Sequence, residues 1–267
     1  MKTRLHSFVK ALRLEWIFFT LSAITDLGMR FNLLLQFMND ILWYSVQIAL
    51  FEALYLHVDA LGGWSLADMR VFLGVIFFVD GLQMVFFEHN FNVLREQVSQ
   101  GDMELMLLKP VSTQQLMTTR RLQCGYLLNV IFAVAWLSWS LPMLPGGFSL
   151  SMLATLVLVV PAGLAIFYAI RLLFSIPTLI ISNSEHIGEI SMSFFRLGFR
   201  PDRLYGPGLR YLILIVIPVG MIASVPARLL IEPFDVWLLA GLLGMSGLFL
   251  FITNRLWHWS IKRYCSA

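Results

Sequence analysis

Two aspartates, Asp40 and Asp80, lie inside apolar runs of this sequence, where an ionisable side chain is costly. Gln47 follows Asp40 by two helical turns and falls on the same stripe of a helix. Such groups usually face the interior of a helix bundle or a water-filled cavity. We therefore expect Asp40, Gln47 and Asp80 to line a path for a transported molecule. The alternative is that they hydrogen-bond neighbouring helices without touching a substrate.

A polar insert, residues 88–119, separates two apolar blocks and carries both signs of charge in the sequence EHNFNVLREQVSQGDMELMLLKPVSTQQLMTT. Gly101 suits the end of a short helix at 93–100, and Asp102 suits the start of another at 103–108. These helices would share an apolar underside, formed by Val98, Met103, Leu105, Met106 and Leu107. Composition leaves open whether a soluble partner docks on the insert or whether it is an ordinary solvated connection.

Motifs of catalytic chemistry are absent from the sequence, which contains no Walker A phosphate loop, no HExxH and no GxSxG. The five histidines fall in separate segments without the spacing of metal ligands. The two cysteines, Cys124 and Cys265, are too few and too far apart for a disulfide framework or a metal site. We expect no catalytic residue, no metal site and no cofactor on this chain.

The composition indicates an integral membrane protein. Hydrophobic residues make up 58% of the 267 residues, charged residues 13%, and the mean hydropathy is +0.78. Soluble domains are about 45–50% apolar and about 25% charged. A soluble protein with so little charge could not cover its own surface, so we expect an all-α membrane fold.

Six membrane spans are predicted, at residues 31–56, 71–87, 122–141, from about 151, 211–225 and 236–251. Residues 1–27 predict an amphipathic helix in the membrane interface, with a signal peptide as the alternative. Arg171 is expected to reach the interface by extending its side chain along the fourth span. The fifth span is short and contains Pro218, so part of 218–233 could be re-entrant between spans five and six.

The positions of lysine and arginine predict the orientation, because such residues concentrate on the cytoplasmic side. With both termini in the cytoplasm, only Arg70 and Arg228 would lie outside. The basic tail, with Arg255, Lys262 and Arg263, fits an anionic inner leaflet more simply than nucleic acid. We expect a multi-pass protein of a bacterial cytoplasmic (inner) membrane that does not bind nucleic acid.

Four stretches resemble a known family. VSQGDMELMLLKPVSTQQL resembles the segment after the second span of type-2 ABC-transporter permeases. GGWS after the first span, IPVGMIASVPARLL in the fifth, and the ending IKRYCSA are similar to the same branch. The similarity extends over nearly the whole chain, and the four stretches occur in the family's order between the predicted spans.

The resemblance implies one permease domain, residues 1–267, with an interfacial elbow helix, six spans, a cytoplasmic coupling helix between spans two and three, and short re-entrant helices before the last span. It also implies an ABC ATPase dimer that binds ATP and Mg²⁺, and a second permease subunit, identical or homologous. The family's coupling role then falls on five residues of the insert: Glu96, Gly101, Asp102, Lys109 and Pro110. Residues 176–203 are more polar than the family pattern, so the end of the fourth span stays open.

The function that follows is export of an unidentified substrate, driven by ATP hydrolysis on a separate subunit. Two other classes stay open. One is a membrane scaffold that transports nothing and whose insert docks a signalling or assembly partner. The other is a membrane-embedded enzyme acting on lipids through Asp40, Asp80 and the histidines.

Overall fold

The structure is a computed structural model that describes residues 17–24, 26, 28, 30–100, 102–109, 111–180 and 187–264. Most of the amphipathic helix expected at 1–27 lies outside the described residues, as do Gly101, Pro110 and Cys265. The described residues form helices and turns without a β-strand. The all-α prediction is confirmed.

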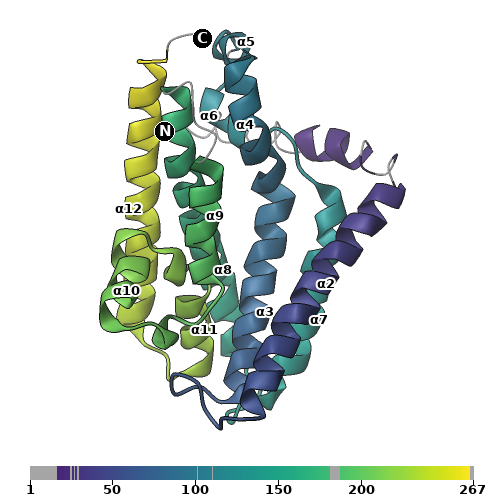
Figure 1. Cartoon of the computed structure of the whole chain (residues 1–267), viewed down its shortest axis with the longest axis vertical. Coiled ribbons are helices and arrows are strands. Elements are labelled where there is room, and N and C mark those ends of the chain that lie inside the picture. The colour runs from purple at the N-terminus through teal and green to yellow at the C-terminus, as the bar shows by residue number, and fades with distance from the viewer. Residues whose placement is uncertain are drawn as a thin grey trace.

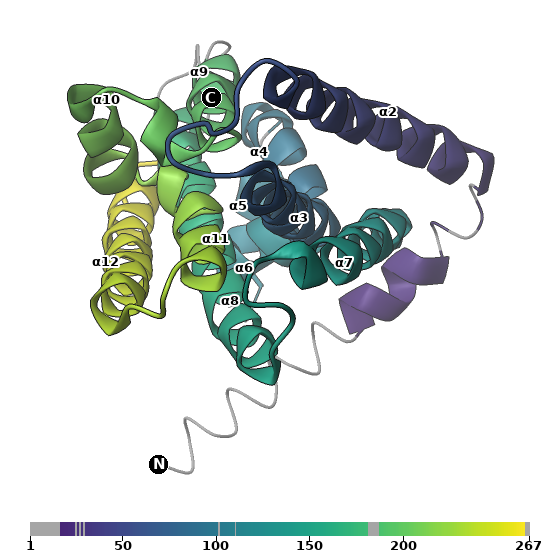
Figure 2. The same ribbon diagram turned by 90° about the horizontal axis from the view of Figure 1, so that it is seen from below.

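Five helical segments of the described chain are long and apolar enough to cross a membrane, and a bent helix pair makes a sixth if it is counted as one span. The five contain α2 Arg30–Tyr55, α3 Leu66–Gln83, α7 Leu127–Ser140, α8 Leu150–Ser175 and α12 Val236–Ile261. Figure 1 shows them running roughly lengthwise through the molecule, and Figure 2 shows α3 near the centre of the bundle. Short 3₁₀ turns flank α7, at Cys124–Tyr126 (η2) and Leu141–Met143 (η3).

The second span and the start of the polar insert form one continuous helix. Ser65 begins α3 with a capping box, in which its side chain accepts from the backbone of Asp68 and Asp68 accepts from the backbone of Ser65. The helix then passes through a π-helical turn, η1 Met84–Glu88, into α4 His89–Ser99. The first predicted insert helix therefore exists, but it begins at the membrane span and not at residue 93.

The rest of the insert folds back onto the bundle through α5 Asp102–Leu107 and α6 Thr113–Thr119. Figure 1 places α4, α5 and α6 at one end of the molecule, called the insert end below. Val98, Met103 and Met106 are buried there in a cluster with Leu172 of α8 and Trp257 of α12. The predicted apolar underside is correct for these three insert residues.

Leu105 and Leu107 were expected on that underside, and this is wrong. Leu105 is 64% exposed and Leu107 40% exposed, because α5 turns Met103 and Met106 inward and leaves its other face to solvent. Leu108, just after α5, is 83% exposed. The insert thus carries an apolar tip of three leucines, Leu105, Leu107 and Leu108.

The chain between α8 and α12 is more broken than the predicted fifth span, residues 211–225. After the 3₁₀ turn η4 Ile176–Leu179, α9 Ile187–Gly198 lies against α8, within the segment that the sequence showed as unusually polar. Then follow η5 Asp202–Leu204, α10 Pro207–Tyr211, η6 Leu212–Val216, η7 Val219–Met221 and α11 Ser224–Ile231. The two arms of this stretch, Pro207–Val216 and Val219–Ile231, are bent by 77°.

Pro218 explains the position of the bend. A proline has no backbone N–H to donate, and it disfavours helical geometry in the residue before it. Ile217 accordingly leaves the helical region, with φ −128° and ψ 87°. The sequence expectation that this span does not run straight is confirmed.

Charged residues tie together the end of the molecule opposite the insert, called the far end below. Arg203 and Arg228 pair with Glu232, and Arg210 pairs with the fully buried Asp202 at 2.8 Å. The ring nitrogen of Trp64, in the turn between α2 and α3, donates to Glu232 at 3.3 Å. The pairs join the α2–α3 turn to the bent helix pair.

This network corrects the charge count used for orientation. Arg203 and Arg210 were assigned to the cytoplasmic segments, yet they lie beside residues of the far end, because α9 has already carried the chain back. The far end therefore holds five arginines, which are Arg70, Arg200, Arg203, Arg210 and Arg228. Four of these five pair with an acid, Arg70 with Glu52 at 2.6 Å, and the fifth, Arg200, is exposed.

A close approach of backbone fixes the bent pair against α8. A Cβ atom added at Gly163 would lie 2.5 Å from the carbonyl oxygen of Ile222. Only a glycine leaves room for that contact, since Cβ atoms are practically never found so near a backbone oxygen.

We expect Gly163→Ala to lower the stability of the purified chain by about 2 kcal/mol through overpacking. The thermal unfolding midpoint in detergent measures the change. Gly241→Ala in α12 is the matched control, because no atom lies within 4 Å of its added Cβ and alanine favours a helix. Equal midpoints for the two variants would contradict the close contact.

Candidate functional site

A cavity of about 540 Å³ lies between α2, the α3–η1 helix, α8 and α9. Its polar lining includes all three residues predicted for a transport path, Asp40, Gln47 and Asp80. The structure therefore brings together side chains from two different helices. Gln83, Glu88 and Arg171 also line the cavity, and the sequence had not assigned them to it.

The two aspartates accept hydrogen bonds from neutral donors. Asn129 of α7 donates to Asp40 at 2.7 Å, which joins α2 to α7. Tyr44 of α2 and Gln83 of α3 both donate to Asp80, at 3.0 Å and 3.2 Å. The helix–helix hydrogen bonding considered as the alternative is thus present, and it occurs in the same residues that line the cavity.

Arg171 is buried, so the expectation that it extends to the membrane interface is wrong. Its guanidinium nitrogen lies 3.6 Å from Glu88 and donates to Asn92 at 3.0 Å, and the side chain stands over the ring of Phe91. The residue is only 7% exposed. A charge removed from water requires such a partner, because desolvation is otherwise too costly.

A sequence signal for this pair does exist. Glu88 and Asn92 are four residues apart and share a helix face, and Arg171 is the only charged residue within α8. A lone arginine in an apolar helix calls for an acidic partner on another helix. The sequence did not indicate which acidic residue would pair with Arg171.

The Arg171–Glu88 pair lies between two cavities. Arg171 lines both the main cavity and a smaller one of about 150 Å³ at the insert end, where Asn92, Ser175, Thr178 and Ser191 join it. The ion pair therefore forms a polar partition on the insert side of the main cavity.

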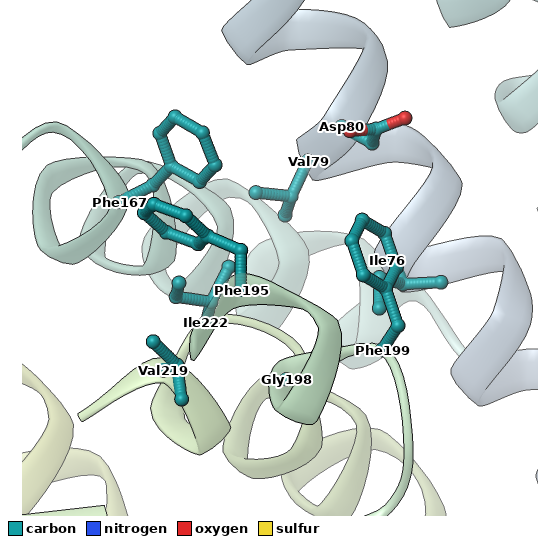
Figure 3. Close-up of a pocket in the computed structure, with 9 residues that line it drawn as sticks. All are labelled: Ile76, Val79, Asp80, Phe167, Phe195, Gly198, Phe199, Val219 and Ile222. Atoms are coloured by element: carbon teal, nitrogen blue, oxygen red, sulfur yellow. The ribbon is translucent and has the colours of Figure 1, made fainter. Parts of the chain in front are cut away.

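Aromatic side chains bound the main cavity on the side of α9. Figure 3 shows the Phe167 and Phe195 rings side by side, with their centroids 4.5 Å apart. Beyond them, Phe199, Val219 and Ile222 leave a space of only about 20 Å³, enough for about one water molecule. The chain is therefore tightly packed between the cavity and the bent helix pair.

The described residues among those predicted to couple the insert to a partner do not line this cavity. Glu96, Asp102 and Lys109 are exposed at the insert end, and Glu96 accepts a hydrogen bond from Gln100 at 2.9 Å. Gly101 and Pro110 lie outside the described residues. The leucine tip, of which the sequence had assigned Leu105 and Leu107 to the buried underside, lies between Asp102 and Lys109 in the chain and is exposed like them.

The described part of the chain contains no group of three or more His, Cys, Asp or Glu side chains that could hold a metal ion. The cavity is lined by carboxylates, amides, guanidinium groups and aromatic rings, which can bind and orient a molecule with a polar head and an apolar body.

Residues 41–267 match the sequence model of a family described as ABC-2 family transporter protein. The match includes the insert, α8, α9 and the bent helix pair. The chain belongs to the ABC-2 transporter family. No curated protein and no solved structure matches it. Membership in the ABC-2 family makes this chain a membrane-spanning transporter component, a type-2 ABC permease that is not itself catalytic.

We expect Arg171→Met to lower the stability of the permease by about 3 kcal/mol, because it leaves the partly buried Glu88 without a cation. Adding Glu88→Gln should recover much of the loss, since the second change removes the uncompensated charge. Unfolding midpoints in detergent for the single and double variants form the test.

Arg196→Met is the control, because Arg196 lines the same cavity but its side chain is exposed. If Arg196→Met costs as much as Arg171→Met, or if Glu88→Gln deepens the loss, the buried ion pair does not stabilise the centre of the molecule.

Proposed function

We propose that this chain is the permease subunit of an ATP-driven ABC exporter in a bacterial cytoplasmic membrane. A separate ATPase dimer would bind ATP and Mg²⁺, and this permease would work with a second permease, identical or homologous. The observation that carries the proposal is the exposed leucine tip on a folded, charged insert of a chain that belongs to the ABC-2 family.

The tip has the chemistry of a docking element. Leu105 and Leu108 are exposed apolar side chains, and Asp102, Glu104 and Lys109 around them are exposed and charged. An apolar centre with a polar rim is the usual composition of a protein–protein contact. We assign the tip and its rim, together with Glu96, Gly101 and Pro110, to the groove of the ATPase subunit.

The buried side of the insert gives this contact a route to the cavity. Met103 and Met106 pack in one cluster with Leu172 and Trp257. Leu172 follows Arg171, the residue that partitions the two cavities. A rigid-body push on the insert would therefore act on α8 and α12 as well as on α3, and so alter the shape of the cavity.

The orientation that suits this role has the insert in the cytoplasm. Lys109, Arg120, Lys262 and Arg263 are exposed and belong to the insert or to the end of α12, which Figure 1 shows at the same end. Of the five arginines at the far end, four are paired with acids, and only Arg200 is exposed without an acidic partner among the described residues. After the correction, more exposed and unneutralised positive charge lies at the insert end than at the far end, which favours an orientation with the insert in the cytoplasm.

Docking at the tip can be tested by one substitution. Leu108→Asp is expected to reduce the amount of ATPase that copurifies with the tagged permease from its native host by roughly tenfold or more, as loss of a central apolar contact does. The copurified protein is identified by peptides containing a Walker A sequence and by ATP hydrolysis.

Leu56→Asp is the matched control, since Leu56 is 82% exposed near the far end. Unchanged copurification of the Leu108→Asp variant, or equal loss in both variants, would count against docking at the tip. Stoichiometric copurification of a partner that is not an ATPase would support the scaffold instead.

The orientation can be tested by cysteine labelling. With Cys124 and Cys265 replaced by serine, Lys109→Cys should resist a membrane-impermeant maleimide in intact cells and react after permeabilisation. Asp59→Cys, in the exposed α2–α3 turn, should react in intact cells. The reverse labelling pattern would place the insert outside and remove the basis for ATPase docking.

A further inference from the structure

The main cavity holds more hydrogen-bond acceptors and negative charge than this chain itself satisfies. We propose that it binds an amphiphile whose head group is a protonated amine, held by Asp40, Asp80 and Gln83. This assignment of a substrate class rests on the proposed export function, but binding to the cavity can be measured without transport.

The charges that line the cavity favour a cation. Three carboxylates, Asp40, Asp80 and Glu88, line it together with the guanidinium groups of Arg171 and Arg196. Arg171 is already engaged by Glu88 and Asn92. Among the ion pairs of the described residues, none involves Asp40 or Asp80, and only neutral groups donate to them. A bound cation would supply the missing charge.

Gln83 adds an unpaired acceptor to these carboxylates. It is 4% exposed and lines the cavity, and its carbonyl oxygen Oε1 has no hydrogen-bond partner. Its amide nitrogen donates to Asp80 at 3.2 Å, on the carboxyl oxygen that does not receive the Tyr44 hydroxyl. The carbonyl oxygen of the Gln83 amide therefore points away from Asp80. A buried acceptor without a donor costs free energy.

This acceptor narrows the class of cation. An ammonium group has N–H bonds that can satisfy both a carboxylate and an amide oxygen, whereas a quaternary nitrogen has none. A terminal hydroxyl group could donate once but would leave the two aspartates without a counter-charge. The geometry therefore favours a protonated amine.

An aromatic wall stands beside these polar groups. Trp43 and Phe199 meet edge to face at 5.0 Å, and Phe167 and Phe195 close the neighbouring side. Aromatic faces attract a cation and accept an apolar body. Two features would suit an anion, the exposed Arg196 and the Nε of Arg171, a buried donor without a hydrogen-bond partner. An anionic ligand is therefore the alternative that the experiment has to separate.

The test uses the full-length permease in phosphatidylcholine nanodiscs and three fluorescent probes that share one dansyl-pentyl body. Dansylcadaverine ends in an ammonium group, and its two analogues end in a hydroxyl and in a carboxylate. Titrations are corrected with empty nanodiscs. We expect the ammonium probe to bind at least roughly tenfold more tightly than either analogue, the change in affinity expected for one satisfied charge.

The variants locate the site. Asp40→Asn and Asp80→Asn should each weaken binding of the ammonium probe by roughly tenfold and leave the hydroxyl probe unchanged. Unchanged hydroxyl binding also shows that the variant still folds. Asp59→Asn, an exposed aspartate of the α2–α3 turn, is the matched control and should bind all three probes as the parent chain does.

Equal affinity for the ammonium and hydroxyl probes, or no effect of either substitution, would overturn the assignment. If the carboxylate probe binds more tightly than the ammonium probe, and Arg196→Gln removes this binding, the cavity binds an anion and the assignment of an amine is overturned. The proposed function can fail independently of the amine site. If an ATPase copurifies with the chain but the chain does not bind the ammonium probe, the exporter proposal stands and the amine site is overturned. If the chain binds the ammonium probe but no ATPase copurifies, the amine site stands and the exporter proposal is overturned.

Discussion

The need to compensate buried charge governs the centre of this molecule. Arg171 is removed from water among apolar helices, and Glu88 and Asn92 from the end of the second span meet it there. An ion pair likewise joins the buried Asp202 to Arg210, whereas Asp40 and Asp80 receive hydrogen bonds from the neutral groups of Asn129 and Tyr44. Because each partner lies on another element, these contacts determine how the helices meet.

The Arg171–Glu88 pair lies where the insert meets the main cavity. Glu88 ends the π-helical turn at which the central helix α3 becomes the insert helix α4. Arg171 precedes Leu172, which packs against the buried methionines of the insert. The insert and the partition between the two cavities are therefore joined through one packed cluster, with Leu172 next to Arg171 in the chain.

Local features were predictable because local physics determines them. Hydropathy indicated the apolar segments, and the Pro218 ring predicted a break in the fifth. The positions of Asp102 and of Val98, Met103 and Met106 predicted the short insert helix and its buried face. The exposed side of that helix was misjudged, because a count of apolar residues does not tell how much of a short helix its neighbours can cover.

The sequence by itself determined an all-α membrane protein with a polar insert after its second apolar helix, since composition and periodicity suffice for that. It also indicated which intramembrane side chains to expect at a cavity. Only the tertiary structure decided that Arg171 pairs with Glu88, that Arg203 and Arg210 lie at the far end, and that Asp40 and Asp80 share one cavity. These are contacts between elements distant in the chain, and the packing of helices against one another selects them.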